Sequence, residues 1–142
     1  MPNDDNERIV MDTLGAIEKR DLEHLTRLQH PDVWFSWPPG LPYSGRFQGS
    51  AEVADMTERF AAVWAELQPT AADRRMDARV VASRDTTVLV SYTWRGRDRV
   101  GKRFETPTLA CYEVRDGLFA GAEMYYFDLM GLIDFLSKAK RN

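Results

Sequence analysis

The stretch TPTLACYEVRDGLFAGAEMYYFD, residues 106–128, decides the fold of this chain. Both of its halves are rich in β-branched and aromatic residues, and Arg115, Asp116 and Gly117 between them have the composition of a tight turn. Gly117 can adopt the positive φ that closes such a turn. The stretch therefore predicts a long antiparallel hairpin, which needs further strands and a helical cover to bury one of its faces.

The rest of the chain supplies those strands and helices. Helical spacing of apolar residues predicts helices over 5–19, 22–30 and 50–67, and extended periodicity predicts strands over 33–37, 43–48, 76–83 and 86–95. Asp128 is expected to cap a final helix over 129–140, while His24 and His30 are expected on the surface or at the end of the second helix. Residues 1–142 thus predict a single α+β domain, with helices on one face of a curved sheet.

The composition argues against several classes of partner and cofactor. A formal net charge of -3 gives no reason to expect binding to nucleic acid or to a membrane, and the basic cluster at 95–103 is typical of a solvated hairpin tip. A single cysteine, Cys111, excludes an internal disulfide and a cysteine-rich metal site. We expect neither a metal nor an organic cofactor. The polar, acidic first residues are unlike a signal peptide, and we expect a cytoplasmic protein.

The order of these elements, with HPDVWFSWPPGLPYSGRFQG at 30–49 and MYYFDLMGLIDFL at 124–136, resembles the SnoaL-like branch of the nuclear transport factor 2-like superfamily. The resemblance implies the ketosteroid isomerase-like fold. This is a cone-shaped, curved antiparallel or mixed sheet with three helices from the N-terminal half and one C-terminal helix, enclosing a cavity for a small hydrophobic molecule. It does not imply one reaction, because unrelated chemistries use this scaffold.

The catalytic residues of the well-understood members are absent at the matching positions. Trp37 stands where ketosteroid isomerase has its general base, and Thr13 and Ala110 stand where it has its oxyanion-hole residues. The position of a limonene epoxide hydrolase acid matches Met124 or Tyr125, neither of which is acidic. None of these mechanisms therefore transfers to this chain.

The register of the hairpin decides which side chains face the predicted cavity. A three-residue turn pairs Val114 with Leu118 and turns inward Thr106, Thr108, Ala110, Tyr112, Ala120, Ala122, Met124 and Tyr126. A two-residue turn would instead turn Gly121, Glu123, Tyr125 and Phe127 inward. We favour the three-residue turn, because it matches the hairpin spacing of the hydrolase and places small and apolar residues inside. The expected ligand-binding residues are then Trp37, Tyr43, Thr108, Tyr112 and Met124, although these aromatic residues could instead simply fill the cone.

The leading hypothesis is a homodimer that binds a small hydrophobic or aromatic metabolite. Any chemistry would be cofactor-independent isomerisation, cyclisation or hydration, with Tyr126 and Asp128 as catalytic candidates and Tyr43 as a further proton donor. Asp128 has a structural alternative as the N-cap of the last helix. The dimer would form through the outer face of the sheet, where Leu109, Cys111 and Tyr125 supply apolar surface. The alternatives are a binding module without catalysis and a pure interaction domain.

Overall fold

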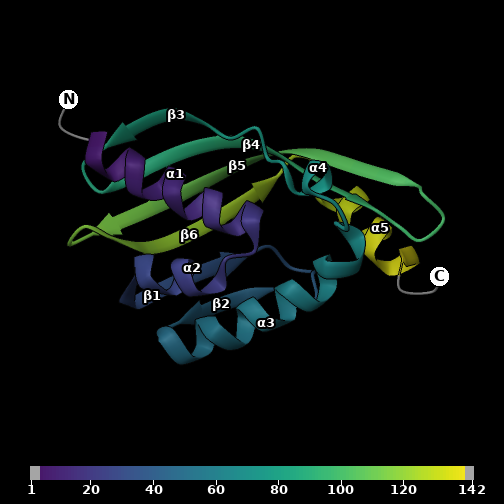
Figure 1. Cartoon of the computed structure of the whole chain (residues 1–142), viewed down its shortest axis with the longest axis horizontal. Coiled ribbons are helices and arrows are strands. Elements are labelled where there is room, and N and C mark those ends of the chain that lie inside the picture. The colour runs from purple at the N-terminus through teal and green to yellow at the C-terminus, as the bar shows by residue number, and fades with distance from the viewer. Residues whose placement is uncertain (1–3, 140–142) are drawn as a thin grey trace.

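The computed structural model describes residues 4–139, which form five helices and six strands (Figure 1). In chain order the elements are α1 (Asp4–Lys19), α2 (Leu22–Leu28), β1 (Gln29–Trp37), β2 (Gly45–Gln48), α3 (Ser50–Leu67), α4 (Ala71–Arg74), β3 (Arg79–Arg84), β4 (Thr87–Arg97), β5 (Arg103–Arg115), β6 (Leu118–Tyr126) and α5 (Leu129–Ala139).

The six strands form one curved, unclosed sheet in the order β2-β1-β6-β5-β4-β3. All neighbouring strands are antiparallel except β1 and β6, which run parallel, so the sheet is mixed. Buried and partly exposed residues alternate along β4 over its whole length, because successive side chains point to opposite faces of a strand. One face of the sheet is therefore turned inward, and the predicted α+β class with a curved mixed sheet is confirmed.

The turn of the central hairpin differs from the prediction. Arg115 pairs with Leu118, so the turn contains two residues, Asp116 and Gly117, with φ values of 54° and 73°. Both lie in the left-handed region, which is typical of the turns that join two strands with a right-handed twist. The predicted three-residue turn is therefore wrong.

A register shift beyond this turn nevertheless restores the predicted inward face. The shift lies between Glu113 and Val114, which pair with Gly121 and Phe119 and leave Ala120 without an opposite residue. Past the shift, the inward-facing pairs are Tyr112 with Ala122, Ala110 with Met124, and Thr108 with Tyr126. The inward-facing residues of both strands were therefore predicted correctly, but each residue of β5 pairs with a residue of β6 that lies two positions later in the sequence than expected.

Most of the predicted helix ends are confirmed. Asp21 caps α2 by accepting a hydrogen bond from the His24 backbone N–H at 3.1 Å, and Asp128 caps α5 in the same way through the Gly131 N–H at 2.9 Å. The prediction for His30 is wrong, because α2 ends at Leu28 and His30 lies in β1. A strand start at 29 is compatible with the following proline, since Pro31 favours extended backbone before it.

The short helix α4 was not predicted. It begins with a capping box, in which the Thr70 hydroxyl accepts from the Asp73 N–H and the Asp73 carboxylate accepts from the Thr70 N–H. Asp73 also pairs with Arg97 of β4 at 3.1 Å. Burial alone would raise the pKa of Asp73, but the hydrogen bonds from Thr70 and the Arg97 guanidinium outweigh burial and lower the pKa.

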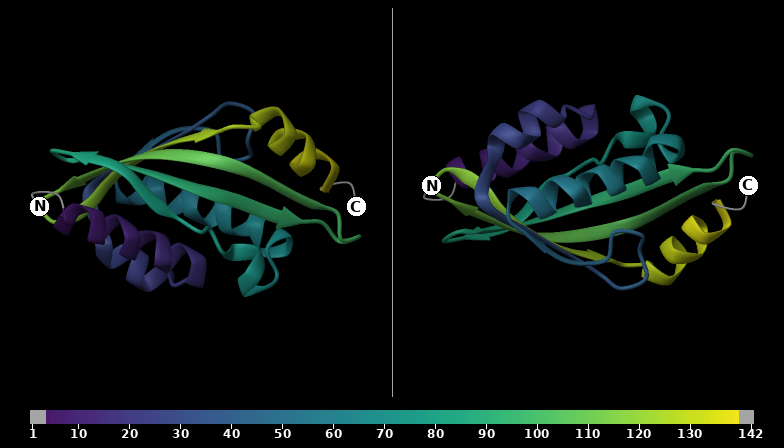
Figure 2. Two further views of the ribbon diagram at one scale, coloured as in Figure 1. Left: turned by 90° about the horizontal axis from the view of Figure 1, so that it is seen from above. Right: turned by 90° about the horizontal axis from the view of Figure 1, so that it is seen from below.

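Helices α1, α2 and α3 gather along one side of the sheet, while α5 lies near the far end of the β4–β5 hairpin (Figure 2). Gly96 in β4 makes the packing at that end possible. A Cβ atom at this position would lie 2.8 Å from a ring carbon of Trp64 in α3 and 3.3 Å from a ring carbon of Phe135 in α5. The absence of a side chain at Gly96 therefore lets both helices approach the strand.

Candidate functional site

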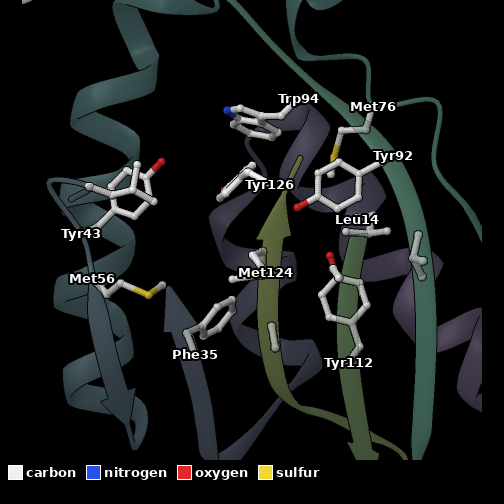
Figure 3. Close-up of a cluster of buried hydrophobic side chains, with 14 of the residues drawn as sticks. Leu14, Phe35, Tyr43, Met56, Met76, Tyr92, Trp94, Tyr112, Met124 and Tyr126 are labelled. Atoms are coloured by element: carbon white, nitrogen blue, oxygen red, sulfur yellow. The ribbon is translucent and has the colours of Figure 1, made fainter. Parts of the chain in front are cut away.

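Aromatic side chains fill the inside of the cone. Tyr43, Tyr92, Tyr112 and Tyr126 come from four different segments and converge there with Trp94 (Figure 3). Tyr43 is fully buried, and at most 9% of any of the other three tyrosines is exposed. Three of the predicted site residues, Tyr43, Tyr112 and Tyr126, thus lie in one cluster, as the filled-cone alternative expects.

The tyrosine hydroxyls bond mainly to one another and to tryptophan. The Tyr43 hydroxyl accepts from the Trp64 indole Nε1–H at 2.9 Å and is also hydrogen-bonded to Tyr126. Tyr112 is hydrogen-bonded to Tyr92, and Figure 3 shows these two hydroxyls directed toward each other. Burial raises the pKa of Tyr43, Tyr92, Tyr112 and Tyr126 far above neutral pH, so these hydroxyls stay protonated and cannot act as bases.

A separate cavity of about 60 Å³ lies between the first helices, β1 and α3. Its walls come from α1, α2, β1, α3 and the loop after α1, and they are apolar except at two residues. The lining residues are Ile17, Arg20, Leu22, Leu25, Phe35, Trp37, Met56, Thr57, Phe60 and Ala61. An apolar concave site with few polar groups is the usual composition of a small-molecule site.

Trp37 joins this cavity to the tyrosine cluster. Its ring stacks on Phe60 with centroids 5.5 Å apart and meets Tyr43 edge-on at 4.8 Å. Its indole Nε1–H donates to the Met56 sulfur at 2.8 Å, which fixes the plane of the ring. Trp37 is the predicted ligand-binding residue that the structure places in the cavity wall.

The other predicted residues lie elsewhere. Met124 is buried on the inner face of β6, and the Thr108 hydroxyl donates to the Thr106 carbonyl at 3.2 Å. Asp128 is exposed at the start of α5, where its carboxylate caps the helix and its backbone N–H donates to the Thr106 hydroxyl at 2.9 Å. Their roles in binding or catalysis stay predictions.

A family model described as a SnoaL-like domain matches residues 10–122. The chain belongs to the SnoaL-like family. None of the curated proteins matches it. No helix within residues 4–139 is long and apolar enough to span a membrane.

Solved structures share the SnoaL-like fold of this chain at low sequence identity. TerC, co-crystallised with polyporic acid, has a TM-score of 0.78 and 18% identity over 94% of this chain and 98% of its own. Bal32a from a soil-derived mobile gene cassette has the same TM-score and identity, covering 96% and 99% of the two chains. A nuclear transport factor 2-like protein of unknown function from Burkholderia pseudomallei K96243 has a TM-score of 0.77 and 21% identity, covering 94% and 98%. At these identities the likeness establishes the fold alone.

Several residues that line this cavity were not predicted as site residues. Leu25, Met56 and Phe60 belong to the apolar stripes of α2 and α3, which the sequence reading assigned only to the core. Phe35 shares a face of β1 with Trp37, so the alternation of that strand could have identified it. No pattern in the sequence identified Arg20 as a site residue. It lies in the loop after α1, and only the packing of α1, α2, β1 and α3 places it in the cavity wall.

Proposed function

We propose that this SnoaL-like protein binds a small apolar or aromatic molecule in the cavity beside Trp37. The observation that carries the proposal is the apolar cavity itself, whose wall contains the rings of Phe35, Trp37 and Phe60; Trp37 stacks on Phe35 at an interplanar angle of 10° and on Phe60 at 29°. Flat aromatic walls favour flat or aromatic ligands, since ring stacking adds to the burial of apolar surface. Co-crystallisation of the structural neighbour TerC with polyporic acid supports small-molecule binding on this scaffold.

Ligand entry requires the cavity to widen, because about 60 Å³ is little space for an aromatic molecule. The short helix α2 is the element best suited to move. It has seven residues, and Leu25 is its one buried side chain. An element with few buried contacts opens at a lower free energy than the core of the domain.

Binding without acid-base chemistry is the function that the side chains support best. The lining residues of the cavity include no carboxylate and no imidazole within the described range 4–139. The buried tyrosines do not line this cavity, and because their hydroxyls stay protonated at neutral pH they cannot act as bases. A cofactor-independent isomerase, cyclase or hydratase remains the second candidate, with Tyr126, Tyr43 or Asp128 as proton donors or orienting groups.

The outer face of the sheet supports the proposal that the protein is a homodimer. Leu109 of β5 and Tyr125 of β6 are paired neighbours there, with 40% and 53% of their surface exposed. Phe127, directly after β6, is 87% exposed. Large apolar side chains gathered on one exposed sheet face are typical of protein interfaces.

A thermal-shift screen against steroids, terpenoids, polyketide-like aromatics and fatty acids tests ligand binding. A ligand at a hundred times its dissociation constant stabilises the folded state by about 2.7 kcal/mol. The cavity-filling variant Ala61→Leu should lose the shift, whereas Ala54→Leu, the same change on the exposed side of α3, should keep it. A shift that survives Ala61→Leu would place the ligand outside this cavity, and the lack of any shift would overturn the proposal.

A further inference from the structure

We propose that Arg20 recognises an anionic group, so that the ligand of the cavity is an apolar carboxylate or an acidic enol rather than a neutral hydrocarbon. This inference rests on the proposed function, because it specifies the chemistry of the molecule bound in the same cavity. It is carried by the position of Arg20 in the cavity wall and by the way its charge is left uncompensated in the fold.

The loop between α1 and α2 brings Arg20 into an apolar wall. Arg20 adopts a left-handed conformation with φ of 58°, which reverses the chain at the end of α1. Its neighbours in the wall include Ile17, Leu22 and Leu25, all apolar. Arg20 and Thr57 are the two polar residues among those that line the cavity.

The guanidinium of Arg20 has neutral hydrogen-bond partners. One nitrogen donates to the Ile17 carbonyl at 2.6 Å, and another donates to the side-chain oxygen of Gln68. An arginine has five N–H donors in a fixed planar fork, so these two bonds leave donors for a further acceptor. No carboxylate within residues 4–139 lies at ion-pair distance from Arg20.

A second arginine increases the positive charge at this place. Burial, and to a smaller extent the nearby Arg74 of α4, lower the pKa of Arg20 to about 10, so Arg20 is still cationic at neutral pH. Arg74 itself donates to the carbonyls of Glu18 and Gln68 at 3.0 and 3.2 Å. The carboxylate of Glu18 is directed elsewhere and accepts from the Met76 N–H at 2.6 Å.

Two other partly buried arginines, Arg95 and Arg97, show a different pattern, whereas the partly buried Arg74 also has no carboxylate at ion-pair distance within residues 4–139. Arg95 lies 2.8 Å from Asp77, and Arg97 lies 3.1 Å from Asp73. A partly buried charge without a counter-ion is unfavourable, and a guanidinium suits the two oxygens of a carboxylate especially well. The surface that faces the closed cavity is almost entirely apolar, so the guanidinium reaches a ligand only when the cavity widens. A ligand that then places its carboxylate or enolate at Arg20 and its apolar part against Trp37 would give the guanidinium a counter-ion.

A purely structural role is the alternative. Arg20 bonds a carbonyl of the last turn of α1, where a cation is favoured by the helix dipole. In that case Arg20 would support the shape of the cavity, and its loss would weaken the binding of every ligand equally. The two roles are therefore separated by comparing charged and neutral ligands of the same shape.

The experiment uses matched pairs of probes: benzoate with benzyl alcohol, 3-phenylpropionate with 3-phenylpropanol, and 2-naphthoate with 2-naphthalenemethanol. Dissociation constants are measured by calorimetry at pH 7 for the wild type and for Arg20→Gln, Arg20→Lys and Arg103→Gln. Arg103 is exposed on β5 and is not among the lining residues, so Arg103→Gln is the control for a change in net charge. Urea unfolding of each variant shows whether the fold is retained.

We expect the wild type and Arg103→Gln to bind the acid of a pair roughly tenfold to a hundredfold more tightly than the alcohol, as for a hydrogen bond to a charged group. Arg20→Gln should abolish this preference while leaving the affinity for the alcohol nearly unchanged, and Arg20→Lys should retain part of it. Equal affinity for acid and alcohol in the wild type, or equal losses for both in Arg20→Gln, would overturn this inference but leave the proposed function standing. Failure of every pair to bind would overturn this inference, and it would overturn the proposed function as well only if the thermal-shift screen also showed no ligand.

Discussion

Replacing Tyr43 by phenylalanine tests how the centre of the molecule is held together. The substitution removes one hydroxyl from a fully buried ring and leaves the shape of the side chain unchanged. That hydroxyl is the acceptor for the Trp64 indole N–H at 2.9 Å and also bonds to Tyr126. Leaving a buried donor without a partner costs about 1–3 kcal/mol, and losing the bond to Tyr126 adds about 0.5–1.5 kcal/mol. We therefore expect Tyr43→Phe to lower the free energy of unfolding by about 1.5–4.5 kcal/mol.

Tyr126→Phe is the matched control for this measurement. It also removes one buried hydroxyl, but the Trp64 indole keeps its acceptor, so we expect a loss of only about 0.5–1.5 kcal/mol. Urea unfolding followed by tryptophan fluorescence measures the loss of unfolding free energy in both variants. The comparison requires that the slope of the unfolding free energy against urea concentration is the same as in the wild type. Equal losses in the two variants, or a loss below about 0.5 kcal/mol for Tyr43→Phe, would contradict the role of Tyr43 as the essential acceptor.

Three further predictions concern other parts of the molecule. Because the folded-state pKa of Asp73 is lowered, its contribution to stability is complete above the unfolded pKa of about 3.9 and is lost as the pH falls below that value. Urea unfolding between pH 6 and pH 3 should therefore show a steeper loss of stability with acid for the wild type than for Asp73→Asn; parallel curves would refute the lowered pKa of Asp73, to which the hydrogen bonds from Thr70 contribute most and the Arg97 guanidinium contributes further. Leu109→Lys should convert the proposed dimer to a folded monomer in sedimentation equilibrium, and an unchanged mass would exclude this sheet face as the interface. Gly96→Ala should lower stability by about 1–3 kcal/mol in thermal or urea unfolding, because its Cβ would lie 2.8 Å from a tryptophan ring. Gly15→Ala, where a Cβ meets nothing within 4 Å, should not be destabilising, and equal losses in the two glycine variants would contradict the packing account.

The fold was largely predictable because its signals are local. Helical and extended periodicities differ along the chain, and the caps at Asp21 and Asp128 are short-range patterns. The capping box of α4 was also visible in principle, but its four residues carry no apolar period. His30 was misplaced because proline was taken only as a helix terminator, although it equally favours a strand before it.

The hairpin shows why the candidate site was harder to predict. Its composition fixes neither the turn length nor the shift at Ala120, and two departures from the predicted pairing combined to restore the predicted face. Alternation could show that Tyr112 and Tyr126 point inward, but not whether they line a space or fill it. That outcome depends on Tyr43 and Tyr92, which meet them only in the folded molecule.

Arg20 illustrates the remaining difficulty. Its significance comes from the absence of a carboxylate partner within residues 4–139 and from its place in an apolar wall, much of which comes from β1 and α3. The basic cluster at 95–103 looked more conspicuous in the sequence, yet two of its members, Arg95 and Arg97, are paired with aspartates in the structure. Charge density in the sequence was therefore a poor guide to which cation is available for a ligand.

The most direct test of ligand binding in the cavity is a crystal structure of the protein with the ligand that gives the largest thermal shift. We expect ligand density between α2, β1 and α3, in contact with Trp37, Phe60 and Met56 and with α2 displaced outward. Ligand density on the outer sheet face beside Tyr125 and Phe127, with the cavity unchanged, would contradict this expectation.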